Sequence, residues 1–323
     1  MRTEDFNYNL PEELIAQEPA AVRDACRMLV MDRESGELED RIFRDIEEYL
    51  RPGDLLVANE TRVMPARLLG AKRGTGGQAE VFLLREVKGE KAKPYLDEAL
   101  TESANQQAIW EVLVRPGKRL KPGSGAVVDF TDKQGNVALS AEVVDWASTK
   151  TDAAATGEGQ DAEASAAKGE RIARLTTTLP SLDEALHAVG HTPLPPYIKN
   201  YAGDEELYQT VYSRREASAA PTAGLHFTPE LIERLKANGV RWKTVELEVG
   251  LDTFRIVDED DPTKHKMHTE FYTVPQTTVD AINETHAAGG RVIAVGTTST
   301  RSLESAWDSQ ANGGEGAITA RNR

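Results

Sequence analysis

Short apolar runs separated by polar turns mark the first 60 residues of the chain. Residues 28–31 (MLVM) are apolar throughout and predict a strand, whereas residues 42–50 predict a helix that ends before Pro52-Gly53. Residues 54–59 (DLLVAN) predict a buried strand that leads into a polar turn. The chain therefore begins with mixed helical and extended structure.

Residues 65–179 contain many short β-type runs, separated by turns with glycine such as 74–77 (GTGG) and 134–136 (QGN). Short strands with regular turns are typical of a small barrel or sandwich. Polar insertions interrupt this region at about 88–107 and 147–169, and the second is rich in Ala, Gly, Glu and Asp. We therefore expect a β-barrel that carries a disordered loop at about 147–169.

Helices and strands alternate after residue 180. Thr228 and Pro229 have the residue types of a helix start, and Ser181 with Glu184 forms a capping box. The remaining predicted elements are strands at 245–249 and 291–295 and helices at 276–288 and from Ser299. Such alternation predicts βαβ units and a mostly parallel sheet.

The predicted fold class is α/β, with a discontinuous α/β domain and an inserted small β-barrel domain. The α/β domain comprises residues 1–64 and 180–323 and contains the mostly parallel sheet, and the barrel comprises residues 65–179. No apolar run reaches the about 18 residues that a membrane span needs, and no secretory signal begins the chain. We expect a cytoplasmic, monomeric protein with no membrane partner.

Composition narrows the functions further. The chain has 38 Lys and Arg against 53 Asp and Glu, so its formal net charge is −15. Non-specific affinity for nucleic acid comes largely from basic side chains, so a general nucleic-acid coat is excluded. Cys26 is the only cysteine, which excludes an intramolecular disulfide and a multi-cysteine metal site.

Two loops of small polar residues have the chemistry of a binding site. Residues 296–299 (GTTS) follow a predicted strand and begin a helix, where backbone N–H groups favour a carboxylate or phosphate; a simple helix cap is the alternative. Residues 220–228 (APTAGLHFT) place His226 just before another helix, whose positive end disfavours the imidazolium form. The alternative for His226 is a packed histidine with no catalytic role.

Residues 265–270 (HKMHTE) contain two histidines and a glutamate. A metal site is disfavoured, because no third ligand stands at a recognisable spacing and Lys266 is cationic. In an extended segment His268 and Glu270 share one face and could act as an acid–base pair. A hydrogen-bonded pair on the surface explains them equally well.

Basic and aromatic residues gather in two parts of the sequence. Asn59, Arg62, Arg67, Lys72 and Arg73 stand close together, and Tyr197, Tyr208 and Tyr212 precede Arg214 and Arg215. Arginines contact phosphates, and tyrosine rings stack on the bases of RNA loops. A solvated surface and a proline-rich turn packed on tyrosines are the alternatives.

Several stretches together resemble the S-adenosylmethionine:tRNA ribosyltransferase-isomerase family of queuosine biosynthesis. The matching stretches are residues 10–17 (LPEELIAQ), 52–57 (PGDLLV), 61–68 (TRVMPARL), 194–198 (LPPYI), 208–212 (YQTVY), 220–228 (APTAGLHFT), 267–270 (MHTE) and 290–305 (GRVIAVGTTSTRSLES). The similarity runs from Phe6 to about Ser305 and is looser in the barrel region.

The resemblance implies a two-domain α/β protein with an inserted barrel. It also implies an enzyme that moves and isomerises the ribosyl part of S-adenosylmethionine onto the aminomethyl group of 7-aminomethyl-7-deazaguanine at the tRNA wobble position. The product would be epoxyqueuosine in the anticodon loop, with release of adenine and methionine. S-adenosylmethionine is then a consumed substrate, and we expect neither a recycled cofactor nor a metal.

The chemistry of the implied reaction, which needs a base beside the sulfonium and groups that hold the two substrates, leads to a hypothesis for the roles of individual residues. Acid–base groups would come from His226, His268 and Glu270. Substrate would be bound by Thr222, Gly224, Thr297, Thr298, Asn59, Arg62 and Arg67, and tRNA by Lys72, Arg73, Arg214, Arg215 and Tyr197.

The chain departs from the family pattern at several positions. Asp252 and Ile256 stand where Gly and Pro are usual, Asp40 where His is often found, and Ala217 where Gly is usual. The chain also ends several dozen residues earlier than family members do, so a C-terminal truncation is expected. An inactive homologue that only binds tRNA or nucleoside is the alternative, whereas a methyltransferase is disfavoured because no Gly-rich loop follows an early strand.

Overall fold

The computed structural model divides into two units, Met1–Val63 with Leu194–Arg323 (the α/β unit) and Met64–Pro193 (the barrel unit). The residues that it describes are 1–97, 106–147, 170–195, 197–199, 201, 203–217, 220–249, 257, 259–265, 267, 269–311 and 316–322. Apart from Ala147, the loop predicted at 147–169 lies outside the described residues.

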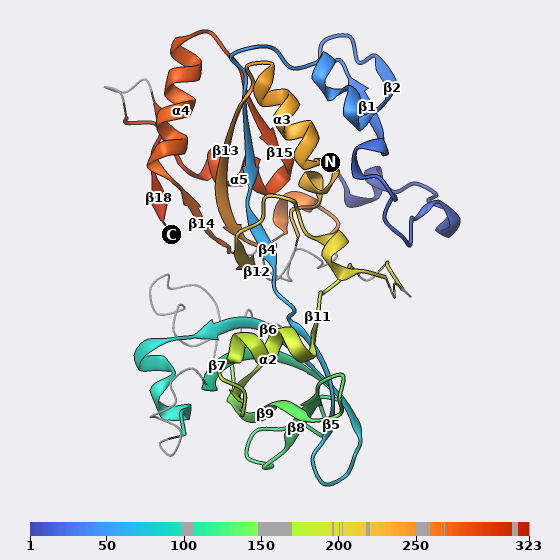
Figure 1. Ribbon diagram of the computed structural model, residues 1–323, viewed down its shortest axis with the longest axis vertical. Helices are drawn as coiled ribbons and strands as arrows, with labels where there is room; N and C mark the ends of the chain where they lie inside the picture. Colours follow the sequence, from blue (N-terminus) through green and yellow to red (C-terminus); the bar gives the residue numbers. More distant parts are fainter. Residues whose placement is uncertain are drawn as a thin grey trace. The chain divides into compact units, whose positions relative to one another are not determined.

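A five-stranded sheet forms the centre of the α/β unit (Figure 1). In spatial order its strands are β15 (Val292–Val295), β3 (Leu55–Asn59), β13 (Arg241–Glu248), β14 (Phe271–Val274) and β18 (Arg321–Asn322). The first three are parallel, and β14 and β18 are antiparallel to their neighbours. The α/β class is confirmed, but the sheet is mixed rather than mostly parallel. Antiparallel neighbours such as β13 and β14 need no helical crossover between them.

Helices cover both faces of this sheet, as Figure 1 shows for α3 and α4. They are α3 (Pro229–Ala237), α4 (Gln276–Ala287), α5 (Gly296–Ser305) and the 3-10 helix η4 (Phe43–Glu48). Side chains alternate along β3, so Leu55 and Val57 pack with α4 and α5, whereas Leu56 packs with α3 and η4. All five residues of β3 are buried, as expected of a central strand with both faces covered.

Helix starts in the structure follow the predicted capping signals. The Thr228 hydroxyl accepts a hydrogen bond from the Leu231 N–H at 3.1 Å, and Pro229 occupies the first turn of α3. The Ser181 hydroxyl accepts from the Glu184 N–H at 3.2 Å at the start of α2 (Leu182–Val189). Both caps satisfy backbone donors that a helix start leaves without partners.

Smaller elements complete the α/β unit. The hairpin β1 (Arg27–Met31) and β2 (Leu38–Ile42) contains the predicted strand at 28–31. The other short pairs are β4 (Thr61–Val63) with β12 (Arg215–Ala217), which are parallel, and β16 (Trp307–Asp308) with β17 (Ala317–Ile318). Short 3-10 helices include η2 (Glu12–Leu14), η3 (Arg23–Ala25), η11 (Glu205–Tyr208) and η12 (Thr222–His226).

The barrel unit is a closed, antiparallel six-stranded barrel (Figure 1). Its strands in spatial order are β5 (Arg67–Lys72), β6 (Gln78–Val87), β7 (Gln107–Arg115), β10 (Glu170–Thr176), β9 (Val137–Trp146) and β8 (Val127–Thr131). Pairing of β5 with β8 closes it. The interior holds fully buried side chains such as Val81, Leu83 and Phe130.

Helix α2 belongs to the barrel unit, although a boundary at residue 180 was predicted. Its buried residues Ala185, Leu186 and Val189 pack into the barrel core. The following strand β11 (Gly190–His191) pairs with β5. The barrel unit therefore extends about one helix beyond the expected boundary, because the capping box indicates where a helix begins and not the surface on which it packs. Within the described residues, no helix is long and apolar enough to cross a membrane.

Candidate functional site

Two adjoining cavities lie in the α/β unit and share a wall formed by Tyr197, Tyr208, Thr222 and His226. The first, which we call the tyrosine cavity, has a volume of about 380 Å³ and is lined by residues 16–20 as well. The second, the threonine cavity, has a volume of about 450 Å³. Its remaining wall includes Pro195, Ala220, Pro221, Ala223, Val249, Gly296, Thr297 and Thr298. Both volumes fall within the about 300–1,000 Å³ typical of small-molecule sites.

The first turn of α5 faces the threonine cavity. Strand β15 ends at Val295, and Gly296 has a positive φ of 84° that allows the sharp turn into the helix. No side chain caps α5, because the Ser299 hydroxyl donates back to the Val295 carbonyl at 2.9 Å. The hydroxyls of this turn thus bond to the helix's own backbone, as in the alternative reading, but none caps the first N–H groups, and the positive helix end faces the cavity beside Thr297 and Thr298.

His226 ends η12 and contributes to the wall between the cavities. Its ring lies 5.1 Å from the Phe43 ring, measured between centroids. Burial lowers the pKa of the imidazole; a hydrogen bond with the Arg23 backbone opposes that shift, and the Arg23 charge adds to it. The predicted preference for neutral imidazole is confirmed in direction, but its main cause is burial rather than the neighbouring helix end.

Gly224 is held against the side chains of Tyr212 and Thr210 and does not line either of the two cavities. A Cβ on Gly224 would lie 1.9 Å from the Tyr212 hydroxyl and 3.0 Å from the Thr210 methyl carbon. The hydroxyl oxygens of Thr210 and Tyr212 are buried without a hydrogen-bond partner among the described residues. Burial also raises the pKa of Tyr212, whose ring packs edge-on against Trp242. Gly224 therefore permits a close approach that any side chain would prevent.

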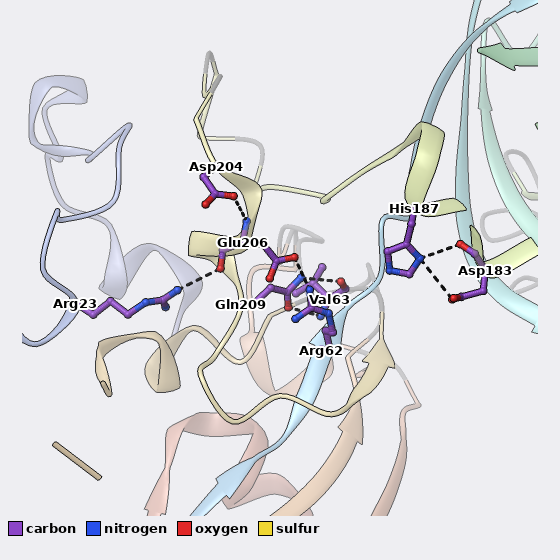
Figure 2. Close-up of polar contacts among 8 residues, drawn as sticks. All are labelled: Arg23, Arg62, Val63, Asp183, His187, Asp204, Glu206 and Gln209. Carbon is purple, nitrogen blue, oxygen red and sulfur yellow. Dashed lines mark hydrogen bonds and ion pairs between the residues drawn. The ribbon is translucent and has the colours of Figure 1, made fainter. Parts of the chain in front are cut away.

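Arg23 is a site residue that sequence reasoning missed. It lines the tyrosine cavity, and its guanidinium donates to the carbonyl of Leu225 at 3.1 Å and to that of Glu206 at 3.2 Å. Figure 2 shows the second of these contacts. Arg23 thus fastens the segment before β1 to η11 and η12, which are about 180 to 200 residues away in sequence. Nothing in its immediate sequence distinguishes it from a surface arginine.

Two predicted substrate-binding residues have structural partners. The Asn59 side chain is buried, accepts from the Leu247 N–H at 3.1 Å and donates to the Leu247 carbonyl at 3.2 Å, which ties β3 to β13. Arg62 forms an ion pair with Glu206, whose N–H is bonded to Asp204 (Figure 2). Neither Asn59 nor Arg62 lines the tyrosine cavity or the threonine cavity.

Gln209 is a further residue with a structural role beside Arg62. Its side-chain amide accepts from the Val63 N–H and donates to the Val63 carbonyl, both at 2.8 Å (Figure 2). This buried pair of hydrogen bonds fixes the end of β4. His187 and Asp183, also drawn in Figure 2, contact one another on α2 of the barrel unit.

The predicted tRNA-binding cations differ in their partners. Arg67 pairs with Glu80 at 2.8 Å and Arg73 with Asp129 at 2.8 Å, both within the barrel unit. Lys72 has no ion pair with a described residue. In the α/β unit, Arg214 is 79% exposed and lies 3.9 Å from a Glu60 carboxylate oxygen. Only the backbone of Arg215 is described, in β12 opposite Thr61.

The acid–base pair predicted at 268 and 270 is described in part. His268 lies outside the described residues, as do Asp252 and Ile256. The Glu270 side chain is 5% exposed, forms an ion pair with Arg301 of α5 and does not line either cavity. Neighbouring His265 contacts the Glu259 carboxylate at 2.7 Å. The described residues contain no group of three His, Cys, Asp or Glu side chains suited to a metal ion.

Comparison with known proteins adds independent information. A family model described as "Queuosine biosynthesis protein" matches residues 3–320. A relative from Acetivibrio thermocellus is 44% identical over 309 residues, covering 95% of this chain and 78% of the relative; it is named S-adenosylmethionine:tRNA ribosyltransferase-isomerase. Relatives of the same name from Symbiobacterium thermophilum and Thermotoga maritima are each 44% identical, covering 95% and 94% of this chain and 78% and 76% of the relatives. A crystal structure of S-adenosylmethionine tRNA ribosyltransferase from Thermotoga maritima is 34% identical, covers 93% of this chain and 72% of that chain, and gives a TM-score of 0.37.

Proposed function

Because the chain belongs to the queuosine biosynthesis protein family, we propose that it is an S-adenosylmethionine:tRNA ribosyltransferase-isomerase. Its substrates are S-adenosylmethionine and a tRNA that carries 7-aminomethyl-7-deazaguanine at the wobble position. The ribosyl part of the first is transferred to the aminomethyl group of the second and isomerised. The products are epoxyqueuosine-tRNA, adenine and methionine.

The observation that carries this proposal is the histidine on the wall between two cavities. Transfer between two substrates requires two ligand spaces in contact, with an acid–base group at the point where they meet. His226 and Thr222 stand at that point. Since burial lowers the His226 pKa, the imidazole is neutral at pH 7 and can accept the proton next to the sulfonium.

The threonine cavity suits the donor. S-adenosylmethionine carries a carboxylate, and the uncapped start of α5 presents backbone N–H groups to that cavity. Thr222, Thr297 and Thr298 add hydroxyl groups that can bind the ribose or the amino acid part. Glu270 does not line the cavity. It acts indirectly, because its ion pair with Arg301 positions that residue of α5.

Release of adenine tests the proposal. Purified protein is incubated with S-adenosylmethionine and a tRNA that carries 7-aminomethyl-7-deazaguanine, and adenine is measured by chromatography. We expect one adenine for each tRNA modified, and none with a tRNA that carries guanine at the same position. Binding of the tRNA without adenine release would instead show an inactive homologue.

A further inference from the structure

The tyrosine cavity is lined mainly by aromatic and apolar side chains. Tyr197, Tyr201 and Tyr208 line it together with apolar side chains such as Leu207 and Ile198. Aromatic rings stack on the faces of nucleobases, and enzymes that act on one base of a nucleic acid hold it in a closely fitting pocket outside the stack. The cavity therefore has the lining that a single flat base needs.

Two charged side chains, Glu18 and Arg23, stand close together in sequence in the lining of the tyrosine cavity. Arg23 contacts two backbone carbonyls, and no carboxylate pairs with it among the described residues. Glu18 is exposed and makes no hydrogen bond or ion pair with any described residue. Glu18 and Arg23 are the acidic and the basic side chain of the cavity lining. The other titratable side chains that line it are the tyrosines, His226 and Cys26.

One carboxylate and one guanidinium complement the edge of a guanine-type base. That edge presents the O6 acceptor next to the N1–H and N2–H donors, so a carboxylate accepts from the donors while a cation faces O6. An adenine-type base carries a donor at the six position instead. The charges on the cavity wall thus favour guanine-type bases over adenine-type ones.

We propose that the tyrosine cavity binds the 7-deazaguanine base of the tRNA, with Glu18 accepting hydrogen bonds from its N1–N2 edge. The inference rests on the proposed function, in which the donor occupies the threonine cavity. The aminomethyl group is on the five-membered ring, remote from N1 and N2. Recognition of that edge therefore leaves the amine free to reach the shared wall at His226 and Thr222.

Substitution of Glu18 by Gln tests the edge contact, because glutamine keeps the shape but loses the charge. We expect the KM for the modified tRNA to rise about ten-fold or more, the scale of one lost bidentate base contact, while the KM for S-adenosylmethionine is unchanged. Glu13→Gln is the matched control: Glu13 is also exposed and lies in η2, but it does not line the cavity.

Filling the cavity provides a second test that does not depend on the edge. Ala20 is exposed and lines the tyrosine cavity, whereas its exposed neighbour Ala21 does not. We expect Ala20→Trp to abolish turnover of the tRNA while calorimetry still shows S-adenosylmethionine binding at the wild-type Kd. Ala21→Trp should behave as wild type in both measurements.

The outcomes separate this inference from the proposed function. If the wild type releases adenine but Glu18→Gln and Ala20→Trp leave the KM for tRNA unchanged, the inference is wrong and the proposed function stands. A rise in the KM for S-adenosylmethionine with both variants would place the donor in the tyrosine cavity and overturn the inference too. If the wild type releases no adenine from the modified tRNA, both are overturned.

Discussion

Polar side chains are partnered differently in the barrel and around the cavities of the α/β unit. Several barrel arginines pair with carboxylates on neighbouring strands, for example Arg73 with Asp129 and Arg174 with Glu142, whereas buried Arg171 donates to the Gly117 carbonyl. Next to Gly224 of η12, in contrast, the hydroxyls of Thr210 and Tyr212 are buried and have no hydrogen-bond partner in the part of the chain that the structure describes. Unsatisfied buried groups cost stability. This cost falls where Gly224 of η12 packs closely against Tyr212 and Thr210. We therefore interpret the barrel ion pairs as contacts that stabilise the fold, and η12 as a segment shaped for the cavities that it lines.

The largest effect is expected from the residue at the shared wall. His226→Gln removes a proton acceptor from both cavities, so kcat should fall about 10²- to 10⁴-fold, the range for a lost acid–base group. Steady-state adenine release measures kcat. His187→Gln, on α2 of the barrel unit, is the control and should keep wild-type kcat. An unchanged kcat for His226→Gln would show that η12 supplies no acid–base group to the reaction.

The pH dependence sharpens the same assignment. The pKa of His226 lies below its ordinary value of 6.5, so the acid limb of the kcat/KM profile should have its midpoint below 6.5. At a pH between the His226 pKa of the folded chain and that of the unfolded chain, His226 is protonated in the unfolded chain and neutral in the folded chain. The stability contributed by neutral His226 is therefore complete above pH 6.5 and is lost as the pH falls. Urea unfolding of wild type and His226→Gln between pH 5 and 8 should show a steeper loss at low pH in the wild type.

Gly224→Ala should cost both stability and activity. Its Cβ would lie 1.9 Å from the Tyr212 hydroxyl, and such overpacking lowers the free energy of unfolding by about 1–3 kcal/mol. Movement of η12 to relieve the clash should also lower kcat. The barrel provides the control, because a Cβ on Gly77 would meet only the Thr75 hydroxyl at 3.8 Å. Equal effects of Gly224→Ala and Gly77→Ala would break the comparison.

Two tyrosine substitutions should change stability in opposite directions. Tyr212→Phe removes a buried hydroxyl that no described residue bonds, and should raise the free energy of unfolding by about 1 kcal/mol. Tyr95→Phe in the barrel unit removes a hydroxyl that donates to Asp145 at 2.8 Å, and should lower it by about 1 kcal/mol. Urea unfolding measures both. A loss of stability in both variants would mean that the Tyr212 hydroxyl is partnered in solution.

The smallest effect concerns the two cations at one end of β5. Arg73 is neutralised by Asp129, whereas Lys72 has no ion pair with a described residue. If this end of the barrel contacts tRNA phosphates, Lys72→Gln should reduce the salt dependence of tRNA binding by about one phosphate contact, a slope change near 0.9. Arg73→Gln should change it less. The reverse order would show that the Asp129 pair opens on tRNA binding.

Much of the fold was predictable because its signals are local. The helix predicted at 276–288 is α4 at Gln276–Ala287, and the cap at Thr228 is present with its predicted partner type. The packing partner of α2 was not predictable, since an amphipathic helix of eight residues fits the barrel or the sheet equally well in sequence. The mixed sheet was also missed, because strand direction depends on the connections and not on the strands themselves.

The candidate site was predictable only in part, for a related reason. His226, Thr222, Thr297, Thr298 and Tyr197 were all selected, and the structure brings them to the two cavities. Asn59 looked equally suitable at a strand end, but its amide is bonded to Leu247, about 190 residues later. Residues 18–20 and Arg23 gave no signal, because a cavity wall built from distant segments leaves no spacing pattern in the chain.

The wall shared by the two cavities has a consequence for inhibitor design. If the donor occupies the threonine cavity and the base the tyrosine cavity, as we propose, a single molecule that joins an adenosyl group to a 7-deazaguanine by a short linker would pass His226 and occupy both spaces at once. Binding of one half holds the other at a millimolar effective concentration, so such a compound should bind about 10²- to 10⁴-fold more tightly than either half alone. The residues that carry the transfer would then also define the selectivity of an inhibitor.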